Sequence, residues 1–416
     1  MNAFSIRLER FRSELKWLFC ELYPENGSEF ELLIEKMQQA YKTRSTSLRE
    51  RDSLFMNNPA WYRMASMQEK FAKSEANVAE MAIEETPDTA EKFFKTVDRF
   101  LAFSAEDLDL LKVSGIEGIF IIPNTIWQHR QKTHDFTRIV RIVDDIVCPS
   151  ILLSLEAKST REEINAFFGE IEKPEFHMID DRFFIPALWN SVATQDTRLL
   201  SEEIRQHSQQ PKFCVYTRSL NCEDGFTWEL DYAFLDILKM QKESHCKYLN
   251  DFYTKRRKGE KTRAKALKDE AGEIIGIQGE TEKLIRGDES LNELLHAVLF
   301  IQSGIPLLEE KTGKKNTKAE KDPFEKLLKF RRSYHAFDSN ADVWTMDTDN
   351  NAILGVGRYK EGQKVYGFFN FSPDPQVFTV RDPGTYENLL TGKTVKVSGL
   401  VRLPAYGYAW LFRENG

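Results

Sequence analysis

The segment Ile151-Leu-Leu-Ser-Leu-Glu-Ala-Lys158 decides the fold, because it is an aliphatic run that stops abruptly on a carboxylate. A short, nearly continuous apolar run is typical of a strand buried on both faces, as in a parallel sheet covered by helices. A charge at the end of a buried strand costs free energy unless another group pairs with it or uses it. Glu156 is therefore the first candidate functional residue.

Similar apolar runs recur along the middle of the chain and alternate with helical patterns. They span residues 78–83, 117–123, 150–157, 175–179, 212–219 and 304–310. Strands that alternate with helices predict an α/β fold with a parallel sheet. Because the pattern provides about six strands rather than eight, we expect an incomplete (β/α) TIM-like barrel. We also expect the strand at 117–123 to lie beside the strand at 150–157, with the helix at 136–146 in the crossover.

The regions on either side of this core have different patterns. Near the N-terminus, apolar residues recur every three or four positions, which predicts amphipathic helices. These residues are Phe4, Leu8, Phe11, Leu15, Leu18 and Leu22, followed by Phe30, Leu33, Ile34, Met37 and Tyr41. From about residue 340 the pattern is strand and turn only, which predicts an antiparallel β-sandwich. We therefore expect a helical domain at 1–76, a shortened barrel-like domain at 77–335 and a β-sandwich domain at 336–416.

The composition excludes several classes of protein. The chain has 416 residues, of which 41% are hydrophobic, and a formal net charge of -7. This acidic balance argues against nucleic acid or an anionic membrane as the main partner. The N-terminal segment has no hydrophobic signal core and no stretch that could span a bilayer, which predicts a cytoplasmic protein. Histidines and carboxylates show no metal-ligand spacing and no glycine-rich phosphate loop is found, so we expect neither a metal nor a cofactor.

One basic segment is a candidate nucleic-acid site. Residues 254–268, with the sequence TKRRKGEKTRAKALK, are rich in lysine and arginine and contain a single acidic residue, Glu260. Phosphate contacts would draw on such charges. The segment has no aromatic side chain on which a base could stack, so we expect a solvated loop.

The order of the motifs resembles the α-amylase clan, glycoside hydrolase family 13, and within it most closely the amylosucrases. The segments that carry the resemblance are RSTSLRERDSLFMNNPAW (44–61), LLKVSGIEGIFIIP (110–123), ILLSLEA (151–157), PALWNSVATQDTRLL (186–200), VYTRSLNCEDGFTW (215–228), FIQSGIPLLEEKTG (300–313) and NLLTGKTVKVSGLVRLPAYGYAWL (388–411). Each segment alone is a weak or moderate signal. Together they run in the family order over most of the chain, and they imply a helical cap, a barrel and a C-terminal β-sandwich.

By this resemblance Glu156 falls on the position of the acid/base carboxylate. Between Pro123 and Asp135 the chain has only NTIWQHRQKTH, where the family has a large loop, the third and fourth strands and the Arg-x-Asp nucleophile motif. The position of the third, stabilising carboxylate aligns with Asn221. The resemblance therefore implies a catalytically inactive pseudoenzyme with a binding or regulatory role in α-glucan or sucrose metabolism.

An active enzyme is the alternative. It would be a retaining α-glucosyl transferase or hydrolase that uses Glu156 with a second carboxylate about 5 Å away. The candidates for that second carboxylate are Asp224, Glu223 and Asp181.

Three further residues are candidates for contacts with substrate. Arg218 ends the strand at 212–219 and could pair with Glu156, and Trp127 and Trp228 lie near predicted strand ends. Aromatic faces either stack on a sugar ring or fill a core, and both roles are open for these tryptophans. The expected partners are sucrose or an α-glucan, together with a second copy of the chain or an active homologue that covers the open sheet edges.

Overall fold

The computed structural model describes residues 3–44, 80–83, 85–105, 118–123, 130–148, 151–156, 161–170, 173–207, 215–255, 264–307, 325–338 and 341–414. The chain divides into two compact units, one formed by residues 1–180 with 211–216 and the other by residues 181–210 with 217–416. The predicted boundaries at 76 and 335 remain predictions. The N-terminal helices and the C-terminal strands each share a compact unit with part of the barrel-like region.

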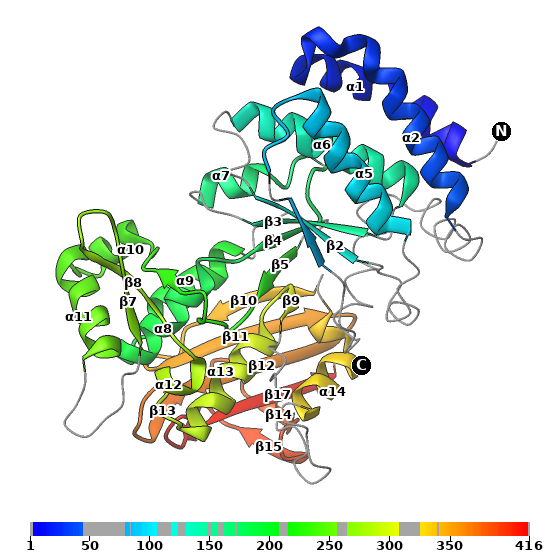
Figure 1. Cartoon of the computed structure of the whole chain (residues 1–416). Helices are drawn as coiled ribbons and strands as arrows, with labels where there is room; N and C mark the ends of the chain where they lie inside the picture. Colours follow the sequence, from blue (N-terminus) through cyan, green and yellow to red (C-terminus); the bar gives the residue numbers. More distant parts are fainter. Residues whose placement is uncertain are drawn as a thin grey trace, which may run out of the picture. The chain divides into compact units, whose positions relative to one another are not determined.

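The first unit contains a parallel sheet whose strands follow one another in sequence order (Figure 1). Its strands are β1 (Glu80–Ala82), β2 (Gly118–Pro123), β3 (Ile151–Glu156) and β4 (Met178–Asp180). Strands β2 and β3 pair over their full length, from Gly118 opposite Ile151 to Pro123 opposite Glu156. The prediction that these two strands are neighbours is confirmed.

Helices α1 and α2 belong to the same unit as this sheet. Within the described residues of the unit, the helices are α1 (Ala3–Leu22), η1 (Pro24–Glu29), α2 (Phe30–Thr43), α5 (Ala90–Ala105), α6 (Arg130–Val147) and α7 (Arg161–Ala166). Helix α1 packs on α6, where the Arg7 guanidinium donates to the carbonyl oxygens of Asp145 and Ile146 at 3.1 and 2.9 Å. The predicted apolar stripe is buried at Leu15 and Leu33, which are both 0% exposed.

The second unit contains parallel strand ends and several helices. Strand β5 (Val215–Arg218) crosses the unit boundary and its last residues pair in parallel with β9 (Ile305–Pro306). In the described residues the hydrogen-bonded order is β1-β2-β3-β4-β5-β9, so the expectation of about six barrel strands is confirmed. The helices of the unit are α8 (Phe184–Thr194), α9 (Arg198–His207), α10 (Tyr232–Ile237), α11 (Lys242–Thr254), α12 (Thr281–Leu284), α13 (Glu289–Ile301), α14 (Glu325–Ser333) and η3 (His335–Phe337).

A small antiparallel sheet in this unit was not predicted. It consists of β6 (Phe226–Thr227), β8 (Ile274–Gln278) and β7 (Lys265–Lys268), in that order. The expectation of a loop at 254–268 is therefore wrong for the last residues, because Lys265 and Ala266 pair with Gln278 and Ile277. Residues 256–263 of that segment lie outside the described residues.

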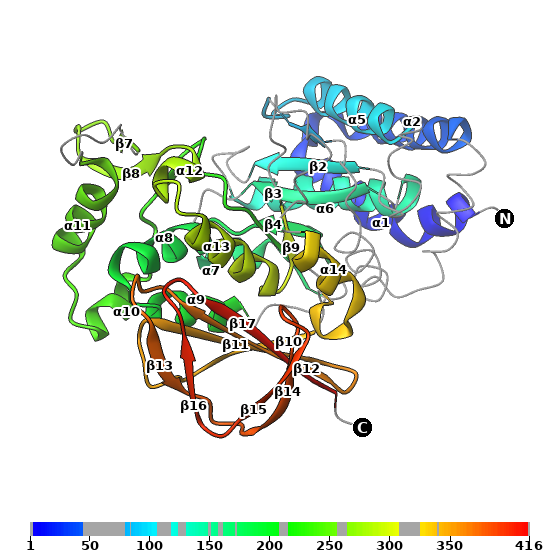
Figure 2. The same cartoon turned by 90° about the horizontal axis from the view of Figure 1, so that it is seen from below.

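The C-terminal strands form the predicted antiparallel sandwich (Figure 2). One sheet has the order β10 (Asp342–Met346), β11 (Ile353–Lys360), β12 (Gln363–Asn370), β17 (Tyr408–Glu414), β14 (Gly384–Asn388), β15 (Lys393–Val397), and the other pairs β13 (Gln376–Thr379) with β16 (Leu400–Leu403). Helix α13 contacts β12, and a Cβ at Gly367 would lie 2.2 Å from Ile301 Cδ1. One hydrophobic core runs from Phe184 to Trp410, so the sandwich shares its core with the helices of this unit.

Among the described helices, none combines the length and the apolar character that crossing a membrane requires.

Candidate functional site at the carboxyl ends of the strands

Two carboxylates end neighbouring strands of the first unit. Strands β3 and β4 pair Ser154 with Met178 and Leu155 with Ile179, and the next residue on each strand is Glu156 and Asp180, respectively. Glu156 and Asp180 are both exposed. Neighbouring strands lie about 4.8 Å apart, so these two residues end the strands side by side. In parallel α/β folds this carboxyl edge is where ligands bind.

The sequence pattern predicts Glu156 at this edge but not Asp180. The predicted strand ends at residue 179, and the candidate carboxylate that follows it is Asp181. The signal was present, because Asp180 follows the apolar pair Met178 and Ile179 in the same way that Glu156 follows its own run.

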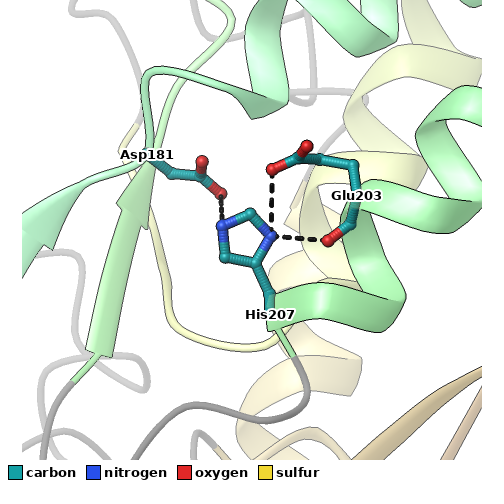
Figure 3. Close-up of side chains that lie close together, drawn as sticks. All are labelled: Asp181, Glu203 and His207. Carbon is teal, nitrogen blue, oxygen red and sulfur yellow. Dashed lines mark hydrogen bonds and ion pairs between the residues drawn. The ribbon is translucent and has the colours of Figure 1, made fainter. Parts of the chain in front are cut away.

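Asp181 lies in a buried network of the second unit (Figure 3). Its Oδ2 accepts a hydrogen bond of 2.6 Å from Arg218 Nε, and its Oδ1 accepts one of 3.2 Å from the Phe184 backbone N–H. The Asp181 N–H donates to the Thr217 carbonyl at 2.9 Å. The side chain of Asp181 is 0% exposed, so this carboxylate serves the packing of the strand ends.

His207, the last residue of α9, joins Asp181 to Glu203. Its Nε2 lies 3.2 Å from Asp181 Oδ2, and its Nδ1 lies 2.8 Å from the Glu203 carbonyl oxygen and 3.3 Å from Glu203 Oε1. These three side chains offer potential metal ligands that lie within 4.8 Å of one another. The two carboxylates face opposite nitrogens of the imidazole, as Figure 3 shows, and this arrangement favours an ion-pair network over a metal centre.

Three buried arginines bind the carboxyl end of α13. Arg218 donates to Ser303 O, Arg331 donates to Phe300 O at 2.6 Å, and Arg358 donates to Ile301 O and Gln302 O at 2.8 and 2.7 Å. The last carbonyls of a helix have no partner within the helix and carry the negative end of its dipole, so the three cations stabilise this end.

The burial of these arginines affects their titration. Burial lowers the pKa of Arg331 to about 10; the charge of Arg218 adds to this effect and that of Asp338 opposes it. Burial also holds the pKa of Arg358 well below its usual range, with the charge of Arg331 as the next cause. Arg218, predicted to contact substrate, is thus held by Asp181 on one side and by the end of α13 on the other.

The turn after β5 contains two other predicted residues. The Asn221 Oδ1 accepts a hydrogen bond of 2.7 Å from the Glu223 N–H, and the Asn221 N–H donates to Ser219 Oγ at 3.1 Å. Asn221 is half-buried, whereas Glu223 and Asp224 are exposed. Asn221 therefore organises the turn at the position where the resemblance expects a stabilising carboxylate.

Of the two tryptophans predicted to contact substrate, the structure describes Trp228 but not Trp127. Trp228 is 3% exposed, its ring is stacked on Tyr253 with 5.9 Å between centroids, and its Nε1 donates to Asn250 Oδ1 at 2.7 Å. Its burial and its stacking on Tyr253 favour the core role, one of the two roles that the sequence leaves open for Trp228. Trp127 lies outside the described residues.

Solved α-amylases are similar in structure to this chain. For AmyP in complex with maltose, the identity is 11%, the match covers 85% of this chain and 78% of AmyP, and the TM-score is 0.50. The maltogenic α-amylase AmyB from Thermotoga neapolitana gives 12% identity, coverage of 79% and 67%, and a TM-score of 0.50. The chain has an α-amylase-like fold.

A further α-amylase and one domain family are also similar to this chain. The α-amylase from Geobacillus thermoleovorans complexed with acarbose shares 12% identity, with coverage of 78% of this chain and 65% of the amylase and a TM-score of 0.50. This α-amylase-like chain thus spans slightly less than two thirds of that enzyme. Residues 356–411, in the sandwich, match the family described as beta-galactosidase C-terminal domain.

Proposed function

We propose that this chain is an amylosucrase-like cytoplasmic protein that binds sucrose or an α-glucan and has lost the retaining glycosidase reaction. The observation that carries the proposal is the pairing of β2 with β3 along their whole length. By the resemblance to family 13, the strand that carries the nucleophile would stand between these two. The continuous register from Gly118–Ile151 to Pro123–Glu156 leaves no position for it.

Without a nucleophile, the chain cannot perform the retaining glycosidase reaction. A retaining glycosidase needs one carboxylate that attacks the sugar carbon and a second, about 5 Å away, that donates and recovers a proton. Loss of a nucleophile removes the covalent step, and catalytic groups that act as a unit account for roughly 10³ to 10⁶ in rate. Asp181, one candidate for the missing role, has both oxygens engaged by Arg218, His207 and the Phe184 N–H.

The test is the release of glucose and fructose from sucrose and from maltooligosaccharides at high protein concentration. We expect no turnover by the wild type or by Glu156→Gln, and calorimetric binding of an α-glucan by the wild type. Glu35→Gln, an exposed carboxylate on α2, is the matched control. Turnover that Glu156→Gln abolishes and Glu35→Gln preserves would overturn the proposal in favour of an active transferase or hydrolase.

We also propose that the protein self-associates. In the described part of the sheet the outermost strands are β1 and β9, and a strand without a neighbour exposes backbone groups that pair readily with another chain. Size-exclusion chromatography with light scattering should give a mass of at least two chains. A monomer at high concentration would contradict this expectation.

A further inference from the structure

We propose that the Glu175 carboxyl is a pH-sensitive switch: its protonated form holds the hairpin at 167–176 on helix α6, and its ionised form lets this hairpin open. The hairpin directly precedes β4, and both the hairpin and α6 belong to the first unit. The inference concerns the opening of this segment and goes beyond the proposed function.

The backbone alone holds this hairpin weakly. Its two arms meet around an isolated antiparallel bridge. The Glu175 N–H donates to the Phe168 carbonyl oxygen, and the Phe176 N–H donates to that of Phe167, each at 3.3 Å. N–H···O hydrogen bonds in proteins are usually 2.7–3.2 Å long, so these two are long and weak. Side-chain contacts therefore decide how firmly the hairpin stays in place.

Helix α6 supplies those contacts. The Nδ1 of His134 lies 2.7 and 2.9 Å from the two carboxylate oxygens of Glu175, and the ring of His134 is stacked on Phe167 with 4.1 Å between centroids. The Arg138 guanidinium also donates to the Pro174 carbonyl oxygen at 2.9 Å. The imidazole thus contacts both arms of the hairpin, and Glu175 is its charged partner there.

The surroundings of Glu175 favour its neutral form. Its side chain is 14% exposed, and this burial raises the pKa of the carboxyl above the usual value of 4.5. The hydrogen bond from His134 and the charges of His134 and Arg138 oppose the effect of burial, and the charge of Asp135 adds to it. From α1, Glu14 binds Arg138 at 2.8 Å and partly neutralises its charge. Burial is the largest of these effects.

The direction of the pH dependence follows from this shift. A group whose pKa is higher in the folded state adds stability below its unfolded value, and this stability is lost as the pH rises through the folded value. Above that value Glu175 carries a charge in a place that solvates it poorly, and opening the hairpin returns the charge to water. The hairpin should therefore be most firmly closed near pH 4 and open more readily as the pH rises toward 8.

The experiment is hydrogen exchange of the full chain, measured by mass spectrometry on peptides that cover 167–176. Wild type is compared with Glu175→Gln, which has the shape of the protonated carboxyl and cannot ionise. The control is Glu170→Gln, at an exposed position of the same hairpin. The ratio of wild-type opening to Glu175→Gln opening should rise by about threefold or more from pH 4 to pH 8, since one pKa unit corresponds to about a tenfold change. Glu170→Gln should follow the wild type at every pH.

Two results would overturn the switch. A ratio that stays constant with pH would leave Glu175 as a structural contact only. Greater opening of Glu175→Gln than of the wild type at pH 8 would show that the ionised pair with His134 is what holds the hairpin. The wild type by itself gives a second test that needs no variant. After correction for intrinsic exchange rates, the opening of 167–176 relative to β12 should increase from pH 4 to pH 8, and no increase would also overturn the inference.

Discussion

Arg218 Nε donates a 2.6 Å hydrogen bond to Asp181 Oδ2 at a position where both side chains are almost completely buried, with exposed fractions of 2% and 0%. This ion pair joins the last residue of β5 to the residue that follows β4. Burying two charges is costly, and the cost is offset only when each charge has partners on all sides. Asp181 has His207 and Arg218 has the Ser303 carbonyl, so the pair is the centre of a larger network.

The first prediction is that Arg218→Met destabilises the protein by about 3–5 kcal/mol, because it leaves the Asp181 charge buried without its guanidinium. The double variant Asp181→Asn/Arg218→Met should recover part of this loss, since it removes both charges. Arg198→Met, at a pair in which the arginine side chain is 39% exposed, is the control and should cost about 1 kcal/mol or less. Urea unfolding measures the free energy of unfolding of each of the three variants. Equal losses in Arg218→Met and the control would contradict the network.

The second prediction concerns the shape of Arg358 and not only its charge. Arg358 donates to four carbonyl oxygens, those of Ile301, Gln302, Ala336 and Asp338. A lysine ammonium is a point donor on a flexible stem and cannot cover this spread. Arg358→Lys should therefore destabilise by about 2–4 kcal/mol, because buried carbonyls lose their partners.

The matched control for Arg358→Lys is Arg402→Lys, at an exposed position of β16. We expect its unfolding midpoint in urea to stay within error of the wild type. If Arg402→Lys destabilised the protein as much as Arg358→Lys does, loss of the guanidinium shape at Arg358 would not be the cause.

The third prediction tests the close approach of β6 and β8. A Cβ at Gly276 would lie 2.0 Å from the Phe226 carbonyl oxygen and 2.7 Å from Thr227 Cα, and backbone atoms cannot move aside as a side-chain end can. Gly276→Ala should cost about 1–3 kcal/mol. At Gly384 the nearest atom is the end of the Arg413 side chain at 3.0 Å, so Gly384→Ala should be nearly neutral. Thermal unfolding compares the two variants. Similar midpoints for Gly276→Ala and Gly384→Ala would exclude the backbone clash at Gly276 as the cause.

The fourth prediction is a pH dependence at Asp382. The hydrogen bond from the Tyr366 hydroxyl, 2.6 Å long, and the charges of Arg413 and Lys364 hold the pKa of this carboxyl below its usual value of 3.8, against a smaller opposing effect of burial. A pKa that is lower in the folded state adds stability above the unfolded value, and this stability is lost as the pH falls through the folded value.

Asp382→Asn should therefore be less stable than the wild type at pH 7, and the difference should shrink between pH 4 and pH 2. The effect should be a fraction of a kcal/mol, because the side chain is 36% exposed and solvent screens its charge. Thermal unfolding over this pH range measures it. A difference that is constant with pH would exclude the titration of Asp382 as its cause.

The sequence by itself determined most elements of the fold, but not the small sheet β6-β8-β7. The six strands of the parallel sheet and the strands of the sandwich each follow from the hydrophobic pattern of one short segment, and such patterns depend on neighbours along the chain. The sequence also predicts that β2 and β3 are neighbours, because only a short segment and one helix join them. Glu156 was found for the same reason: a charge that ends an apolar run is a local signal.

Only the tertiary structure decided what the charged residues do. Arg218, Arg331 and Arg358 come from distant parts of the chain and converge on the end of α13, and no local pattern specifies that convergence. In the same way, Asp180 and Asp181 are adjacent in sequence, but Asp180 is exposed and Asp181 is buried. Hydrophobic periodicity is a property of single segments, whereas the partners of a charge depend on how segments pack, so the site could be read only from the folded chain.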